Sequence, residues 1–143
     1  MKKLLKCRTG NVPVLTVGFI FVLLLTTFLI MEMGGAFENY EYAESVLQRS
    51  CNTAVEANIN DAYRADKILL LDTDGAKADF RTFAYRDMPS RFQFTIDSVT
   101  AQESPPSMEA TGTVTFSTLF DQYGFDDLTF HFKVVATNYD LVE

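Results

Sequence analysis

The feature that most constrains this chain is a run of 23 uncharged residues at positions 9–31, dominated by Val, Leu, Ile and Phe. As a helix rising 1.5 Å per residue, the run would be about 34 Å long, which is enough to cross a hydrocarbon core of about 30 Å. A buried core helix of this length is not expected in a chain of 143 residues, which has room for one ordinary domain and an appendage. We therefore predict a transmembrane helix at 12–33, preceded by a basic leader at 1–11.

The charges on either side of the run predict its orientation. Four basic and no acidic side chains precede it: Lys2, Lys3, Lys6 and Arg8. Acidic side chains follow it: Glu32, Glu38, Glu41 and Glu44. Basic flanks stay in the cytoplasm, so a single-pass cell-membrane protein with residues 34–143 outside the cell is expected. That outer part carries 18 acidic and 8 basic side chains, a net charge of −10, which argues against nucleic acid as a partner.

A cleavable export signal is the alternative interpretation of the N-terminus. Gly34 and Ala36 supply a small-x-small exit, and cleavage after Ala36 would release a soluble acidic domain. The apolar run is longer than the 7 to 15 residues typical of a signal, and Glu32 stands in the approach to the exit. An anchor is therefore favoured over a signal.

An amphipathic helix is predicted to follow the membrane span, within an extracellular segment at 34–75. Apolar residues recur there in steps of three and four. They are Phe37, Tyr40, Ala43, Leu47, Cys51, Ala54, Ile59, Ala62 and Leu69. The paired glycines Gly34 and Gly35 would join the two helical segments, either as a point of bending or as a plain break at the membrane surface.

The remainder, 76–143, is predicted to be an α+β head. Gly75 could end the long helix, and Asp74 could cap a second helix at 76–85, although the aromatic content there also permits a strand. Three later segments alternate with a period of two, which indicates an antiparallel meander whose apolar face packs on the long helix. The expected inward residues are Phe92, Phe94 and Ile96, then Val114 and Phe116, then Leu128, Phe130, Phe132 and Val134.

The sequence has few residues that could bind a metal or act in catalysis. His131 is the one histidine and falls on the polar face of the last expected strand, so no metal site, cofactor or catalytic residue is predicted, and the chain is not expected to be an enzyme. Cys7 and Cys51 would lie on opposite sides of the membrane and cannot pair within one chain. Whether Cys51 forms an intermolecular disulfide stays open.

Three stretches within residues 8–60 resemble the TadE/TadG-like pseudopilins of tight-adherence (Flp-type) pilus systems. They are "RTGNVPVL" at the start of the span, "EMGGAF" at its outer edge, and the Ala-bearing helix "YAESVLQRSCNTAVEANI". The resemblance implies a pilin-like, non-catalytic, membrane-anchored minor pilin or a component of pilus or secretion-apparatus assembly. Its partners would be membrane lipid and other pilin-like subunits or platform proteins.

Candidate sites follow from the resemblance and from the span itself. Cleavage by a prepilin peptidase would fall between Gly10 and Asn11, but Leu15 stands where the TadE kind carries Glu, so the TadG kind fits better. Glu32, at the outer edge of the span beside the glycine pair, is either an interfacial carboxylate or a charge that marks assembly. Gly18 would permit close helix approach.

Two other classes of protein remain open. One is a single-span membrane protein whose extracellular domain binds a ligand or another protein. The other is the exported soluble domain. An enzyme is the least expected class.

Overall fold

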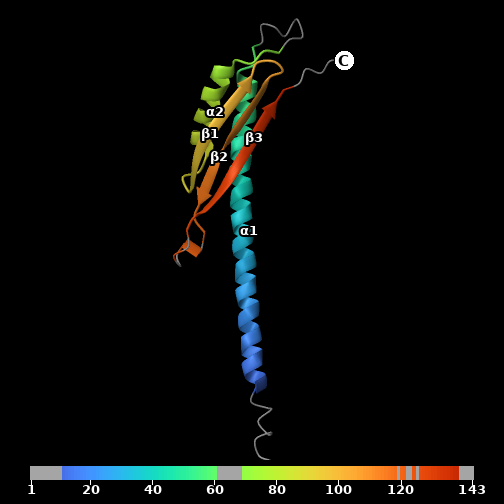
Figure 1. Cartoon of the computed structure of the whole chain (residues 1–143), viewed down its shortest axis with the longest axis vertical. Coiled ribbons are helices and arrows are strands. Elements are labelled where there is room, and N and C mark those ends of the chain that lie inside the picture. Colours follow the sequence, from blue (N-terminus) through green and yellow to red (C-terminus); the bar gives the residue numbers. More distant parts are fainter. Residues whose placement is uncertain (1–10, 61–68, 119, 122–123, 125, 139–143) are drawn as a thin grey trace, which may run out of the picture. The chain divides into compact units, whose positions relative to one another are not determined.

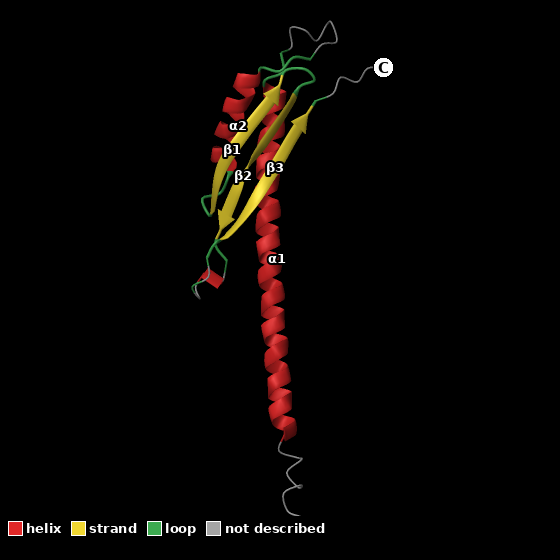
Figure 2. Cartoon of the chain, in the orientation of Figure 1, coloured by secondary structure: helices red, strands yellow, loops and turns green. Residues whose placement is uncertain are grey.

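The computed structural model describes residues 11–60, 69–118, 120–121, 124 and 126–138 of the chain. It contains two helices and three strands (Figures 1 and 2). They are α1 (Asn11–Ala57), α2 (Thr73–Asp87), β1 (Phe92–Gln102), β2 (Ser107–Phe116) and β3 (Leu128–Thr137). The chain divides into two compact units, Met1–Phe37 and Glu38–Glu143, and we call the second unit the head. The predicted α+β class is confirmed.

Helix α1 differs from its prediction in two ways. It runs as one helix through Gly34 and Gly35, so of the two alternatives for the glycine pair the plain break is wrong. It also ends at Ala57, well before Gly75, where the sequence predicted its end. Leu71 instead forms an isolated antiparallel bridge with Ile59, while Ala62 lies outside the described residues.

The part of α1 that belongs to the head buries one stripe. The buried residues are Ala43, Val46, Leu47, Ser50, Cys51, Ala54 and Val55. Their steps of three and four place them on one helix face, which confirms the predicted Ala43, Leu47, Cys51 and Ala54. Ser50 fits within this apolar stripe because its hydroxyl donates a hydrogen bond of 2.9 Å to the Val46 carbonyl.

The three strands form one antiparallel sheet in the order β1-β2-β3, which confirms the predicted meander. Strand β2 alternates strictly, and its buried residues are Met108, Ala110, Gly112, Val114 and Phe116. In β3, Phe132 and Val134 are buried and Phe130 is half-buried, as the period of two predicts. Leu128 was also expected inside but is 38% exposed, because it lies at the end of the sheet.

Strand β1 carries a β-bulge at Asp97. Ile96 pairs with Gly112 and Ser98 pairs with the adjacent Thr111, which leaves Asp97 as the extra residue. The bulge reverses the side-chain alternation, so the half-buried positions continue at Val99 rather than at Ser98. The expected inward positions Phe94 and Ile96 are half-buried before the bulge, and Phe92 is fully buried.

Helix α2 begins differently from its prediction. Its N-cap is Asp72, not Asp74, and the Asp72 carboxylate accepts hydrogen bonds from the backbone N–H groups of Asp74 and Gly75 at 3.2 and 3.1 Å. Gly75 therefore lies in the first turn of α2 and does not end α1. A Cβ at this position would collide with the side chains of Asn58 and Asp72.

The second helix packs its small and aromatic face into the head. Ala76, Phe80 and Ala84 are buried, which settles the helix-or-strand alternative in favour of a helix. Helix α2 lies against β1, where the Tyr85 and Phe94 rings are 4.7 Å apart. The same C-terminal end of α2 also contacts α1, because Arg49 forms an ion pair of 3.7 Å with the Asp87 carboxylate.

A substitution at Gly112 tests how closely the sheet is packed. A Cβ at this position would collide with the Thr95 carbonyl oxygen and lie 2.7 Å from a ring atom of Phe132, which is itself 2% exposed. We expect Gly112→Ala to lower the free energy of unfolding of the head by about 1–3 kcal/mol, because the backbone and a packed ring must both shift. Urea unfolding of the full chain in detergent micelles, followed by tyrosine fluorescence, would measure the loss.

Gly34→Ala is the matched control. Nothing lies within 4 Å of a Cβ added at Gly34, and alanine favours a helix interior over glycine. This variant should unfold no earlier than the original chain. Equal stability of the two variants would contradict the packing of Gly112.

Candidate functional site

The first half of α1 exposes an almost continuous apolar surface. Its large apolar side chains are each at least 39% exposed: Val12, Val14, Leu15, Val17, Phe19, Ile20, Phe21, Val22, Leu23, Leu24, Leu25, Phe28, Leu29, Ile30, Met31 and Met33. Within the described part of the chain, α1 is the one helix long and apolar enough to cross a membrane. An apolar surface of this extent is unfavourable in water and needs a cover of lipid or protein.

The threonine side chains of this segment are hydrogen-bonded within the helix. The hydroxyls of Thr16, Thr26 and Thr27 donate hydrogen bonds of 2.8–2.9 Å to carbonyl oxygens four residues earlier in the helix. Such bonds leave the hydroxyls without a need for water, as a hydrocarbon environment requires. The segment is thus chemically suited to lipid along its whole surface.

The predicted cleavage and packing residues lie at the start of α1. Gly10 lies outside the described residues, and Asn11 is the first residue of the helix. Leu15 is 66% exposed. No atom lies within 4 Å of a Cβ added at Gly18, so this glycine meets no neighbour from its own chain and leaves the backbone open to another helix.

Glu32 lies among exposed neighbours but is itself covered. Its exposed fraction is 9%, against 71% for Met31 and 74% for Met33. A carboxylate that extends freely toward water would be far more exposed. Gly34 and Gly35 follow inside the same helix, with no neighbouring atom that requires glycine there. A role of Glu32, Gly34 and Gly35 in assembly stays a prediction.

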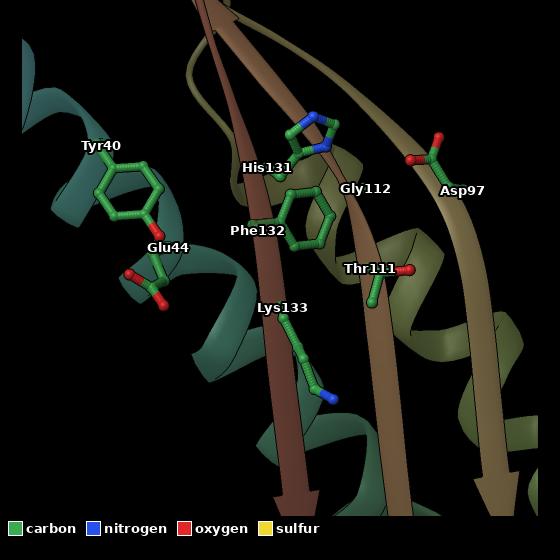
Figure 3. Close-up of a pocket in the computed structure, with 8 residues that line it drawn as sticks. All are labelled: Tyr40, Glu44, Asp97, Thr111, Gly112, His131, Phe132 and Lys133. Carbon is green, nitrogen blue, oxygen red and sulfur yellow. The ribbon is translucent and has the colours of Figure 1, made fainter.

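The head carries an open groove that is lined both from α1 and from the exposed face of the sheet at β3. A cavity of about 510 Å³ is lined by Tyr40, Glu44, Asp97, Thr111, Gly112, His131, Phe132 and Lys133 (Figure 3). His131 and its neighbours Thr129 and Lys133 are exposed on the polar face, as predicted. The Lys133 ammonium also forms an ion pair of 2.9 Å with Glu109.

The α1 side of the groove was not found in the sequence analysis. Burial raises the pKa of Tyr40, and the charge of Glu44 and a hydrogen bond with it raise that pKa further. The spacing of four residues between Tyr40 and Glu44 is the signal that could have found the pair. No group of three or more His, Cys, Asp or Glu side chains that could hold a metal occurs among the described residues.

Cys51 is fully buried between α1 and the sheet. Its Sγ lies 3.8 Å from the Met108 carbonyl oxygen, to which the thiol donates. Burial raises the pKa of the Cys51 thiol to about 11, and a backbone hydrogen bond with Ala136 opposes this shift. The neutral thiol is therefore a packed apolar group, and an intermolecular disulfide would require the head to open.

Comparisons with known proteins identify no relative of this chain: no family model, curated protein or solved structure matches it.

The buried thiol predicts how stability depends on pH. The pKa of Cys51 is about 11 in the folded head, whereas 9.0 is the ordinary value that the unfolded chain should show. Because the folded state holds this proton more tightly, the contribution is fully present below pH 9 and is lost as the pH rises toward 11. We expect the free energy of unfolding to fall over this range in urea titrations.

Cys51→Ala is the control for this pH dependence. It retains Cys7 and every tyrosine and lysine, so the difference between the two chains isolates Cys51. The variant should be less stable at pH 8 but should lose less stability between pH 9 and 11. Parallel curves for the two chains would show that Cys51 is not buried as a neutral thiol.

Proposed function

We propose that this chain is a non-catalytic, membrane-anchored subunit of a pilin-like surface or secretion assembly. The main support for a membrane anchor is the exposed apolar surface of α1, whose threonine hydroxyls are hydrogen-bonded within the helix. The four basic residues before the span and the acidic residues after it support a cytoplasmic N-terminus and an extracellular head.

The assembly role is supported by the resemblance of "RTGNVPVL" and "EMGGAF" to TadE/TadG-like pseudopilins. The large apolar side chains of this part of α1 are exposed and leave its surface open to a neighbouring helix. Side-by-side packing of such helices exchanges lipid contacts for protein contacts, and Gly18 permits close approach. Membrane lipid and other pilin-like subunits or platform proteins are thus the proposed partners.

A second candidate function is a single-span receptor whose extracellular head binds a ligand or protein. The groove beside α1 and β3 favours this function, because it offers polar and charged groups together with an aromatic ring. The two functions share the anchor and differ in what α1 contacts inside the membrane.

The native N-terminus tests the anchor. We expect intact-mass measurement of protein extracted from membranes to give a chain that begins at Met1, as in the TadG kind of pseudopilin. A chain that begins at Asn11 would support pilin-type processing and would still retain the anchor. A chain that begins at Phe37 would contradict the membrane anchor and indicate an exported soluble domain.

Crosslinking within the membrane separates an assembly subunit from a lone anchor. We expect a photoreactive phenylalanine analogue at position 18 to crosslink α1 to another protein, because small residues mark helix–helix contacts. The same analogue at position 20 is the control, since two residues turn a helix by about 200° and place Ile20 on the opposite face. Lipid adducts alone at both positions would contradict the assembly role.

A further inference from the structure

The two edge strands of the sheet differ in how accessible their outer edges are to a further strand. The order β1-β2-β3 makes β1 and β3 the edge strands. Strand β1 is bulged at Asp97 and has α2 packed against it, both of which discourage further strand pairing. Strand β3 keeps a regular register with β2 over all ten residues and contains no proline. Its outer edge therefore has the regular geometry that another strand needs.

Two hydrogen bonds establish which backbone groups face outward along β3. The Gln48 side chain holds Val135 from outside the sheet, donating to its carbonyl oxygen at 2.8 Å and accepting from its N–H at 3.4 Å. Toward β2, the N–H of Asn138 donates to the Pro106 carbonyl oxygen at 2.9 Å. Because backbone groups alternate along a strand, the outward set comprises Thr129, His131, Lys133, Val135 and Thr137.

Gln48 occupies one of these outward positions and leaves others open. Among the described residues, no hydrogen bond is made to the outward backbone groups of Thr129, His131 or Lys133. The groove of about 510 Å³ lies beside them and is lined by residues of α1 and β3. Tyr40 and Glu44 lie on the α1 side of β3, whereas the His131 and Lys133 side chains point away from α1, toward β2 (Figure 3). A space therefore adjoins the unpaired part of the edge.

The wall that α1 contributes to this space is acidic. A neighbouring depression of about 300 Å³ is lined by Glu41, Glu44, Ser45 and Gln48. Glu44 lines both hollows, so the two lie next to each other along α1. A side chain that enters from a new strand on this side would meet carboxylates, which favours lysine or arginine.

The exposed face of the sheet shows what the other side of a new strand would meet. Threonine hydroxyls pair across neighbouring strands, Thr95 with Thr113 at 2.7 Å and Thr115 with Thr129 at 2.9 Å. The second pair reaches the β3 edge, so a threonine on an added strand would extend it beside Thr129, as cross-strand hydroxyl pairs do in sheets.

We propose that an extended segment of a partner protein adds to the outer edge of β3 as a fourth strand, with basic residues toward Glu41 and Glu44 and hydroxyl residues on the exposed face. Backbone hydrogen bonds to Thr129, His131 and Lys133 provide the attachment, and the alternating side chains provide the selectivity. Gln48 ends the paired stretch at Val135. The proposal goes beyond the assembly role and depends only on the head.

The probe for this site is an eight-residue peptide that alternates lysine and threonine, titrated into the full chain in lipid nanodiscs and followed by fluorescence anisotropy. We expect saturable binding that weakens severalfold for Glu44→Gln and with added salt. A peptide that alternates glutamate and threonine should not bind. The same peptide with N-methyl groups on one edge should lose at least about tenfold in affinity, because it cannot donate to β3.

Position 131 offers a matched pair of variants. His131→Pro removes an N–H that faces the groove and leaves the ladder to β2 intact, so binding should weaken by at least about tenfold. His131→Ala keeps that N–H and should bind as the original chain does. Circular dichroism checks that the proline variant folds; if it does not, the N-methylated peptide on the original chain still decides the matter.

Three results would overturn the proposal. One is equal binding of the N-methylated and unmodified peptides, and another is tight binding that His131→Pro leaves unchanged. The third is concentration-dependent self-association of the chain that His131→Pro abolishes, which would assign the edge to a second copy of this chain.

Discussion

Packing of α1 against the inner face of the sheet is the interaction on which the head depends. The sheet has only three strands, so it cannot cover its own apolar face, and the buried stripe from Ala43 to Val55 supplies that cover. The contact is nearly all apolar, with Leu47 and Phe132 at most 2% exposed. Polar atoms enter it only where they are bonded, as at Ser50 and Cys51.

The first half of the same helix carries a second apolar surface, and this one is exposed. The two surfaces differ in kind. Within the head the apolar residues form a stripe with polar residues beside it, whereas before Glu32 they extend around the whole helix. A stripe fits one sheet, and an all-round apolar surface fits lipid or several neighbouring helices. One continuous helix thus combines a soluble-type and a membrane-type surface.

Regular sequence patterns made much of the fold predictable. Steps of three and four placed Leu47 and Cys51, and the period of two placed Val114 and Phe132. The failures occur where a residue far away in sequence decides the local structure. Glycine is typical of a helix end, yet Gly75 lies in the first turn of α2, which Asp72 caps. Glycine is needed there because the Asn58 and Asp72 side chains occupy the space of a Cβ. The bulge at Asp97 has no local signal either, since it depends on pairing with β2.

The groove was missed for a related reason. Tyr40, Glu44 and Gln48 occupy successive turns of α1 and read in sequence as an ordinary solvated helix face. Only the register of β3 brings the unpaired backbone of His131 and Lys133 opposite them. Gln48 shows what that register makes possible, because its amide both donates to and accepts from Val135, as a neighbouring strand would. Gln48 therefore blocks strand pairing at Val135. Two residues earlier, the outward backbone groups of Lys133 are open to a new strand.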